Sequence, residues 1–327
     1  MKKQNFLIVG LSGKMGGLTA QRMLALGEHE LSPFGIVADK ENGGVVTIPC
    51  GNGMIRNYPV FSFKGLGNRE LQFIKKEKPI IIDFTLKDVV KQNWETYYKK
   101  WKLPVIFGTI GINKEDIKGN KAPVIIGSPN LCAPIVSLFK FFDGLEENAM
   151  EGVSYYNSES HQSSKLEPSG TEIYFAELFR KAGATEHRLV EKIRFKTRQR
   201  TLGVPEEFLD GHGYHWCHFI PTFDTTPSFR AFSALKMRIM EHMNSFETTY
   251  PNLTDYSIEK LHLSLFNSDG TLIVGYDGDN EHFQIFTKVH GRGPYINGLF
   301  DSVLPAMVGM TQSWGWKRDI VQNMFDL

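Results

Sequence analysis

The chain has 327 residues and a formal net charge of +1, with 37 basic and 36 acidic residues. This length allows two domains, each with its own core. The balanced charge gives no electrostatic footprint for nucleic acid or for a membrane surface, so we expect neither as a partner. The three cysteines are widely spaced, and no apolar run is long enough to span a bilayer. With no signal-peptide pattern at its start, the chain is expected to be cytoplasmic.

A glycine-rich turn follows the first apolar run. Phe6–Val9 predicts a buried parallel strand, and Leu18–Leu26 predicts a helix. Between them, Gly10 permits a tight turn, Gly13 lets the backbone approach a pyrophosphate, and Gly16 lets helix and strand pack closely. The spacing is G-x-x-G-x-x-G, and such a pattern alone is weak evidence. Its place at the first strand–helix junction favours dinucleotide binding.

The second strand is predicted at Pro33–Ala38 and leads into Asp39 and Lys40. In dinucleotide-binding folds, residues at this strand end contact the adenosine ribose. A carboxylate there binds the ribose hydroxyls of NAD, and a cation accommodates the 2′-phosphate of NADP. A solvated charge pair is the alternative interpretation. Because both residue types are present, we expect NADH and NADPH both to bind, with Lys40 weakly favouring NADPH.

Three further buried strands are predicted, each ending in small or polar residues. They are Pro79–Thr85, Leu103–Phe107 and Ala122–Ile126, the last of the series, with a helix expected over Lys87–Lys100. Ligands bind outside the carboxyl ends of strands in open parallel sheets. We therefore expect these ends to face the nicotinamide, through Phe84, Thr85, Gly108, Thr109, Ser128, Pro129 and Asn130.

The stretch Glu159–Thr171 combines a titratable imidazole, an ammonium group and a turn of small hydroxylic residues. His161 can donate a proton, and Lys165 can hold an anion. Pro168–Thr171 predicts a turn opening a helix, whose N-terminal amides and dipole suit a carboxylate. The alternative is a polar surface loop before an ordinary helix.

Strands dominate the chain from Gly152 onward. We expect strands at Gly152–Ser158, Leu189–Thr197, Lys260–Phe266, Thr271–Tyr276 and His282–Val289, a hairpin turn at Asn267–Gly270, and helices at Ala133–Phe142 and Ala231–Asn244. The fold class is therefore α/β, with an N-terminal Rossmann-like doubly wound parallel sheet and an α+β second domain whose sheet is mainly antiparallel. The expected domains are 1–132 with 299–327, and 133–298.

Three histidines and a cysteine lie within His212–His218, which is the density of a metal site. In a strand, however, His212 and His218 face one side and His215 faces the other, because side chains alternate. We therefore expect no metal.

These motifs together resemble the dihydrodipicolinate reductase family, the 4-hydroxy-tetrahydrodipicolinate reductases of lysine and diaminopimelate synthesis. The resemblance spans most of the chain and is closer to the plant-type branch. Its departures are Gln162 in place of a second histidine, Ile110 in place of a threonine, Glu167 in place of an aspartate, and an insertion at Asp224–Asp255. The motifs in the family's order are Gly10–Gly16, Asp83–Thr85, Gly108–Gly111, Ser128–Asn130, Glu159–Thr171 and His290–Gly298.

The resemblance implies hydride transfer from NADPH or NADH to a cyclic unsaturated dicarboxylate. It implies that His161 protonates the substrate and that Lys165 pairs with a carboxylate. A homo-oligomer, either a dimer or a tetramer, is expected. The implied dinucleotide-binding residues also include Lys14, Met15, Arg292 and Tyr295, and the implied substrate-binding residues include Gln162, Ser169, Gly170 and Thr171. Two alternatives stay open: another imine or amino-acid dehydrogenase on this fold, and a non-catalytic dinucleotide-binding protein.

Overall fold

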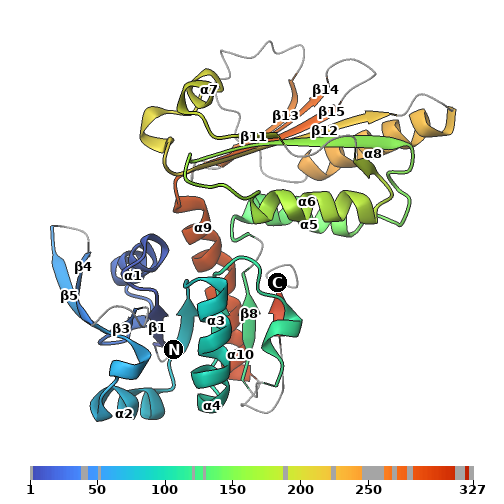
Figure 1. Ribbon diagram of the computed structural model, residues 1–327. Helices are drawn as coiled ribbons and strands as arrows, with labels where there is room; N and C mark the ends of the chain where they lie inside the picture. The colour runs from blue at the N-terminus through green and yellow to red at the C-terminus, as the bar shows by residue number, and fades with distance from the viewer. Residues whose placement is uncertain are drawn as a thin grey trace. The chain divides into compact units, whose positions relative to one another are not determined.

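The structure is a computed structural model in which the chain divides into two units (Figure 1). One unit comprises Met1–Leu131 and Gly298–Leu327, and the other comprises Cys132–Asn297. The residues described are 3–37, 43–50, 53–119, 122–127, 130–186, 191–221, 226–244, 261–266, 271–277, 283–313 and 321–323.

The first unit is built on a sheet of order β16-β8-β7-β6-β1-β3-β5-β4, with β2 also pairing with β1. Its described pairs are parallel except β4–β5, which is an antiparallel hairpin that the sequence analysis did not predict. A further difference is β16, which pairs with β8 and makes the strand near Ile126 an inner one. The strands are β1 (Asn5–Val9), β2 (Glu30–Leu31), β3 (Gly35–Ile36), β4 (Gly44–Pro49), β5 (Ile55–Phe61), β6 (Ile80–Asp83), β7 (Val105–Phe107), β8 (Val124–Ile126) and β16 (Val321–Asn323).

Helices cover both faces of this sheet. Successive residues of β1 point to opposite faces, and every buried residue of β1 is apolar, so both faces present apolar side chains to helices. Leu7 and Val9 pack in one core with residues of α2 and α3, whereas Ile8 packs in a second core with Ala20 of α1. This is the doubly wound arrangement expected from the sequence. The helices are α1 (Lys14–Leu26), α2 (Asn68–Glu77), α3 (Lys87–Asn93), the π-helical η2 (Trp94–Tyr98), α4 (Lys99–Trp101), the π-helical η6 (Leu299–Val303) and α10 (Leu304–Ser313), with 3-10 turns η1 (Phe63–Gly65) and η3 (Lys114–Ile117).

The second unit has a sheet of order β10-β9-β12-β15-β14-β13, with β11 also pairing with β9. The pairs from β9 through β13 are antiparallel, and β10 and β11 run parallel to β9. The expected mainly antiparallel sheet is confirmed. The strands are β9 (Val153–His161), β10 (Thr185–Glu186), β11 (Glu191–Ile193), β12 (His212–Pro221), β13 (Leu261–Phe266), β14 (Thr271–Asp277) and β15 (Phe283–His290).

Helices α5, α6 and α8 lie along one face of this sheet (Figure 1). The ring of Phe179 in α6 packs on Tyr155 and Phe219, with ring centroids 5.2 and 5.0 Å away. The strand expected over Leu189–Thr197 is shorter, because a helix begins at Lys196. The expected turn at Asn267–Gly270 lies outside the described residues. The helices are α5 (Ala133–Asp143), α6 (Gly170–Lys181), α7 (Lys196–Thr201), α8 (Thr226–Asn244) and α9 (Gly293–Gly298), with a 3-10 turn η4 (Glu206–Phe208).

Candidate active site

The predicted dinucleotide turns of the first unit meet at one edge of its sheet. Each turn begins with a backbone hydrogen bond to the end of a neighbouring strand, at 2.7 to 3.0 Å. These bonds run from Gly10 to Ile36, from Phe84 to Val9, from Gly108 to Asp83 and from Gly127 to Phe107. The carboxyl ends of the strands therefore form one continuous platform.

The glycine turn fits a pyrophosphate. Helix α1 begins after Gly13 with no side-chain cap, and its first turn carries no acidic residue. A Cβ atom at Gly16 would lie 2.2 Å from the carbonyl oxygen of Gly10, so only glycine allows this approach. The amides and dipole of the helix N-terminus are thus available in a form that suits a phosphate group.

Asp83 organises the next turn. It is fully buried and accepts hydrogen bonds from the Thr85 amide at 2.7 Å, the Thr85 hydroxyl at 2.6 Å, the Tyr98 hydroxyl at 2.6 Å and the Asn93 amide at 3.3 Å. Burial raises the pKa of Asp83, although these hydrogen bonds oppose the rise. Thr109 donates to the Thr85 carbonyl at 2.6 Å. The strand-end threonines are therefore held in one orientation.

In the second unit, His161 is the last residue of β9 and pairs with Gly213 of β12. Its Nδ1 lies 3.0 Å from the His212 carbonyl oxygen, so Nδ1 carries a proton. Its Nε2 is buried and has no hydrogen-bond partner in the described part of the chain. Burial, followed by the charges of His215, Lys165 and Arg194, lowers the pKa of His161 far below its ordinary value. The resting imidazole is therefore neutral.

Glu159 lies two residues earlier on the same face of β9 and is also fully buried. One carboxylate oxygen accepts from Arg194, and the other accepts from the Ser169 amide at 2.9 Å. The second oxygen is 3.8 Å from Nε2 of His161. Burial raises the pKa of Glu159, but His215, the Ser169 amide and Arg194 together bring it below its usual value. Glu159 is an anion beside the histidine.

A second acid approaches from helix α6. Glu172 is fully buried, and one of its oxygens lies 3.2 Å from Nδ1 of His215. Burial raises the pKa of Glu172, which its contacts with His215 only partly offset. The ring of His215 lies 5.1 Å from the ring of His161. Glu172, a buried acid with a raised pKa, thus contacts His215, and the ring of His215 packs against His161.

Glu159, His161 and His215 present possible metal-ligand atoms within 4.8 Å of one another. Of the three histidines in β12 weighed from sequence, only His215 joins this cluster; His212 bonds Ser160 at 2.9 Å, on the other face of the sheet. Both oxygens of Glu159 are already engaged, and Lys165 and Arg194 put positive charge beside the site. This electrostatic setting favours proton chemistry over cation binding.

Lys165 and Ser169 flank the segment that leads into α6. The Lys165 amide donates to the Gln162 carbonyl at 3.0 Å, and burial lowers the pKa of the Lys165 ammonium. The Ser169 hydroxyl caps α6 by accepting from the Glu172 amide at 3.0 Å. Ser169 therefore contacts both Glu159 and Glu172 within the protein, and its expected contact with a substrate carboxylate stays a prediction.

Comparison with known proteins decides the family. The family model described as "Dihydrodipicolinate reductase, N-terminus" matches residues 4–125. The "Probable 4-hydroxy-tetrahydrodipicolinate reductase 2, chloroplastic" of Oryza sativa subsp. japonica is 30% identical over 67% of this chain and 68% of its own length. The chain belongs to the 4-hydroxy-tetrahydrodipicolinate reductase family.

Other relatives agree with this assignment. "Probable 4-hydroxy-tetrahydrodipicolinate reductase 1, chloroplastic" of the same rice is 31% identical over 68% of the chain, and "4-hydroxy-tetrahydrodipicolinate reductase 2, chloroplastic" of Arabidopsis thaliana is 29% identical over 69%. The aligned region spans 65% of the length of each of these two relatives. The solved aspartate semialdehyde dehydrogenase II from Vibrio cholerae shares the fold, with a TM-score of 0.51 at 9% identity over 93% of this chain and 99% of that one. The plant-type reductase family is thus established, and the fold is one that this solved structure shares.

The structure sorts the predicted residues of this family member into two groups. His161, Gln162, Lys165, Ser169, Gly170 and Thr171 lie in the second unit with Arg292 and Tyr295, and the other candidates that the structure describes lie in the first unit. Tyr295 was predicted to contact the cofactor. A Cβ atom added at Gly213 would lie 3.6 Å from the Tyr295 hydroxyl and would also contact the ring of His161, so both side chains lie beside this glycine. Asp39, Lys40, Ser128 and Pro129 lie outside the described residues.

The sequence analysis gave no role to Asp83, Glu159, Glu172, Arg194 or His215. One of them carried a signal: Glu172 stands three and seven residues before Phe175 and Phe179, on the buried stripe of α6. An acid on an apolar stripe indicates a buried, functional carboxyl group. Arg194 carries no comparable local signal, because its partners other than the adjacent Ile193 lie 27 to 35 residues away.

Among the described residues, no helix combines the length and apolar character that crossing a membrane requires. Cys50, Cys132 and Cys217 form no disulfide bond in the described part of the chain.

Proposed function

We propose that this protein reduces 4-hydroxy-tetrahydrodipicolinate to tetrahydrodipicolinate, with NADPH or NADH as the reductant. One hydride and one proton are taken up, and the 4-hydroxyl group leaves as water. The observation that carries the proposal is the buried cluster of His161, Glu159 and His215, placed beside Lys165 and the start of α6 in a member of this family. In this proposal, residues 1–132 with 299–327 bind the dinucleotide, and residues 133–298 bind the dicarboxylate.

The platform of strand ends and the uncapped start of α1 suit the dinucleotide, which supplies the hydride when bound. Lys165 forms a charge-assisted contact with one carboxylate of the substrate. His161 donates the proton from Nε2, because its Nδ1–H is held by the His212 carbonyl.

The neutral resting state of His161 couples proton donation to substrate binding. The positive charges of Lys165 and Arg194 help to lower the pKa of His161. A bound dicarboxylate brings negative charge that offsets both, so it raises this pKa and favours the imidazolium. Substrate binding therefore favours the protonated form of His161, which is the form that can donate the proton.

A coupled assay tests the proposal. Purified protein is given the product of dihydrodipicolinate synthase, and NADPH or NADH oxidation is followed by absorbance. We expect oxidation that depends on the synthase product with either cofactor. Turnover of other cyclic or acyclic imino acids, but not of this product, would indicate a different dehydrogenase. Tight NADPH binding without oxidation of any substrate would indicate a binding protein.

We also propose that the protein is a homo-oligomer that associates through the sheet face opposite α5 and α6. That face carries half-buried stacked rings: Trp216 on Phe286 with centroids 4.4 Å apart, and Tyr156 on His218 at 4.1 Å. Aromatic side chains of this kind are typical of protein interfaces. Light scattering should give a dimer or tetramer mass for the wild type and a smaller mass for Trp216→Glu. A monomeric wild type contradicts the proposal.

A further inference from the structure

The segment between β9 and α6, which carries Lys165, is held from outside by one neighbouring stretch of chain. Its own surface offers little apolar burial, since Leu166 is 77% exposed. Its carbonyl oxygens instead accept hydrogen bonds from side chains of β11 and α7. Lys192 donates to the Leu166 carbonyl at 3.3 Å, and Gln199 donates to the His161 carbonyl at 2.6 Å. The position of the segment therefore depends on these polar contacts.

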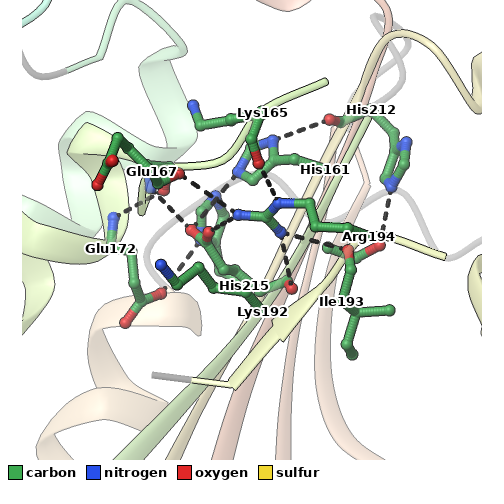
Figure 2. Close-up of polar contacts among 12 residues, drawn as sticks. His161, Lys165, Glu167, Glu172, Lys192, Ile193, Arg194, His212 and His215 are labelled. Carbon is green, nitrogen blue, oxygen red and sulfur yellow. Dashed lines mark hydrogen bonds and ion pairs between the residues drawn. The ribbon is translucent and has the colours of Figure 1, made fainter. Parts of the chain in front are cut away.

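Arg194 is the centre of this set (Figure 2). Its Nε donates to the Lys165 carbonyl, and its Nη1 donates to the backbone carbonyls of Glu159 at 3.4 Å and Ile193 at 3.2 Å. Its Nη2 donates to the Glu159 carboxylate and to the Glu167 carbonyl at 3.5 Å. Every nitrogen of the guanidinium is used, and the side chain is only 13% exposed. A planar fork with five N–H groups can make this set of bonds, whereas an ammonium group cannot.

We infer that Arg194 is a positioning residue that locks the Lys165 segment onto the buried Glu159. This contact fixes the position of the Lys165 ammonium relative to His161, so that both groups can contact the dicarboxylate. Arg194 acts through Lys165, Glu167 and Glu159 and does not itself contact the substrate. The kinetic consequence rests on the proposed function, but the lock itself does not. Small displacements of a catalytic group cost roughly 10²-fold in rate, so a lock of this kind matters.

The test compares Arg194→Lys with the wild type by hydrogen–deuterium exchange and steady-state kinetics. Arg194→Lys keeps a positive charge next to Glu159, so the protein should fold, but it loses the fork. We expect faster amide exchange confined to residues 162–167. We also expect kcat/KM for the dicarboxylate to fall roughly 10²-fold, with an unchanged KM for NADPH. The control is Arg200→Met, which removes another arginine with two hydrogen bonds to one carboxylate, the exposed Glu206, and should change neither quantity.

A double variant separates the lock from the charge. Arg194→Met alone leaves Glu159 as an unpaired buried anion and can fail to fold. Arg194→Met combined with Glu159→Gln removes both charges, and faster exchange at residues 162–167 in this variant supports the lock. Wild-type exchange there in Arg194→Lys, or faster exchange spread evenly over the second sheet, overturns it. If the wild type fails to oxidise NADPH with the dicarboxylate, the proposed function fails, and the exchange experiment still decides the role of Arg194.

Discussion

Asp83 in the first unit and Glu159 in the second are both fully buried carboxyl groups on central strands. Each stands two residues before a predicted site residue, Thr85 in one case and His161 in the other. Their partners differ in charge. Asp83 accepts only from neutral amides and hydroxyls, whereas Glu159 is paired with the guanidinium of Arg194.

The pKa values of the two carboxyl groups move in opposite directions as a result. Burial dominates at Asp83 and raises its pKa, because neutral donors only partly replace water. At Glu159, His215, the Ser169 amide and Arg194 outweigh burial and lower the pKa. The neutral donors around Asp83 hold the strand-end turn in one conformation, which suits the proposed binding of a cofactor there. A retained anion among cations suits a site where proton transfer must be controlled.

The largest effect expected is on chemistry in the second unit. His161→Ala should lower kcat roughly 10²-fold or more, because general acid catalysis is typically worth 10²–10⁴-fold. NADPH affinity should stay unchanged, since the proposed dinucleotide-binding residues lie in the first unit and His161 lies in the second. Thr85→Ala is the matched variant and should do the reverse, weakening NADPH binding more than kcat. Equal effects of both variants on NADPH affinity would contradict this separation.

A smaller effect, on the free energy of unfolding, is expected when the charged carboxylate of Glu159 is neutralised. Glu159→Gln leaves Arg194 as a buried cation without an anionic partner. Breaking such a pair costs about 3–5 kcal/mol of unfolding free energy, and the retained amide contacts place this case near the lower value. Urea denaturation measures the loss. Asp143→Asn, which breaks an exposed pair with Lys181, is the control and should change the unfolding free energy by less than about 1 kcal/mol. Equal losses in the two variants would show that burial of Glu159 carries no energetic weight.

A still smaller loss of unfolding free energy is expected at Asp83, whose hydrogen-bond donors are neutral. Asp83→Asn turns one acceptor into a donor that faces the existing donors of Thr85 or Tyr98. Leaving one buried donor unsatisfied costs about 1–3 kcal/mol. Asp83→Asn leaves no buried charge without a partner, so its loss in unfolding free energy should be less than that of Glu159→Gln. A larger loss in Asp83→Asn would reverse the comparison.

The elements of the fold that carry local patterns were predictable. Phe6–Val9 and Pro79–Thr85 predicted strands because a parallel strand buried on both faces needs a continuous apolar run. Helix α6 was predicted from Gly170 because a turn of small polar residues precedes an apolar stripe. The hairpin β4–β5 was missed, although the β-branched residues Val45–Ile48 carry a strand signal.

The network around the site was not predictable, because its contacts join residues far apart in the chain. Lys165 was singled out from its own segment, but the arginine that holds it lies 29 residues later. His215 was assessed as one of three nearby histidines, and its true partner, Glu172, lies on a different element. Periodicity tells which face a residue occupies, but it does not tell which residue of another element meets it there. Only the packing of α6 and β11 on β9 brings these charges together.

The smallest effect, and the sharpest test of the comparison, is how each substitution depends on pH. The folded pKa of Glu159 is below its unfolded value of about 4.3, so its stabilising contribution is complete above that value and is lost as pH falls through the folded pKa. The folded pKa of Asp83 is above its unfolded value of about 3.9, so its contribution is complete below that value and is lost as pH rises through the folded pKa. The stability difference between wild type and Glu159→Gln should therefore shrink toward pH 4 and below, as about 1.4 kcal/mol per unit of pKa shift is given up. The difference between wild type and Asp83→Asn should instead be largest near pH 4 and shrink as pH rises through the folded pKa of Asp83. Urea denaturation of all three proteins across this range measures both slopes, and slopes of the same sign would mean that the two carboxyl groups are held in the same way.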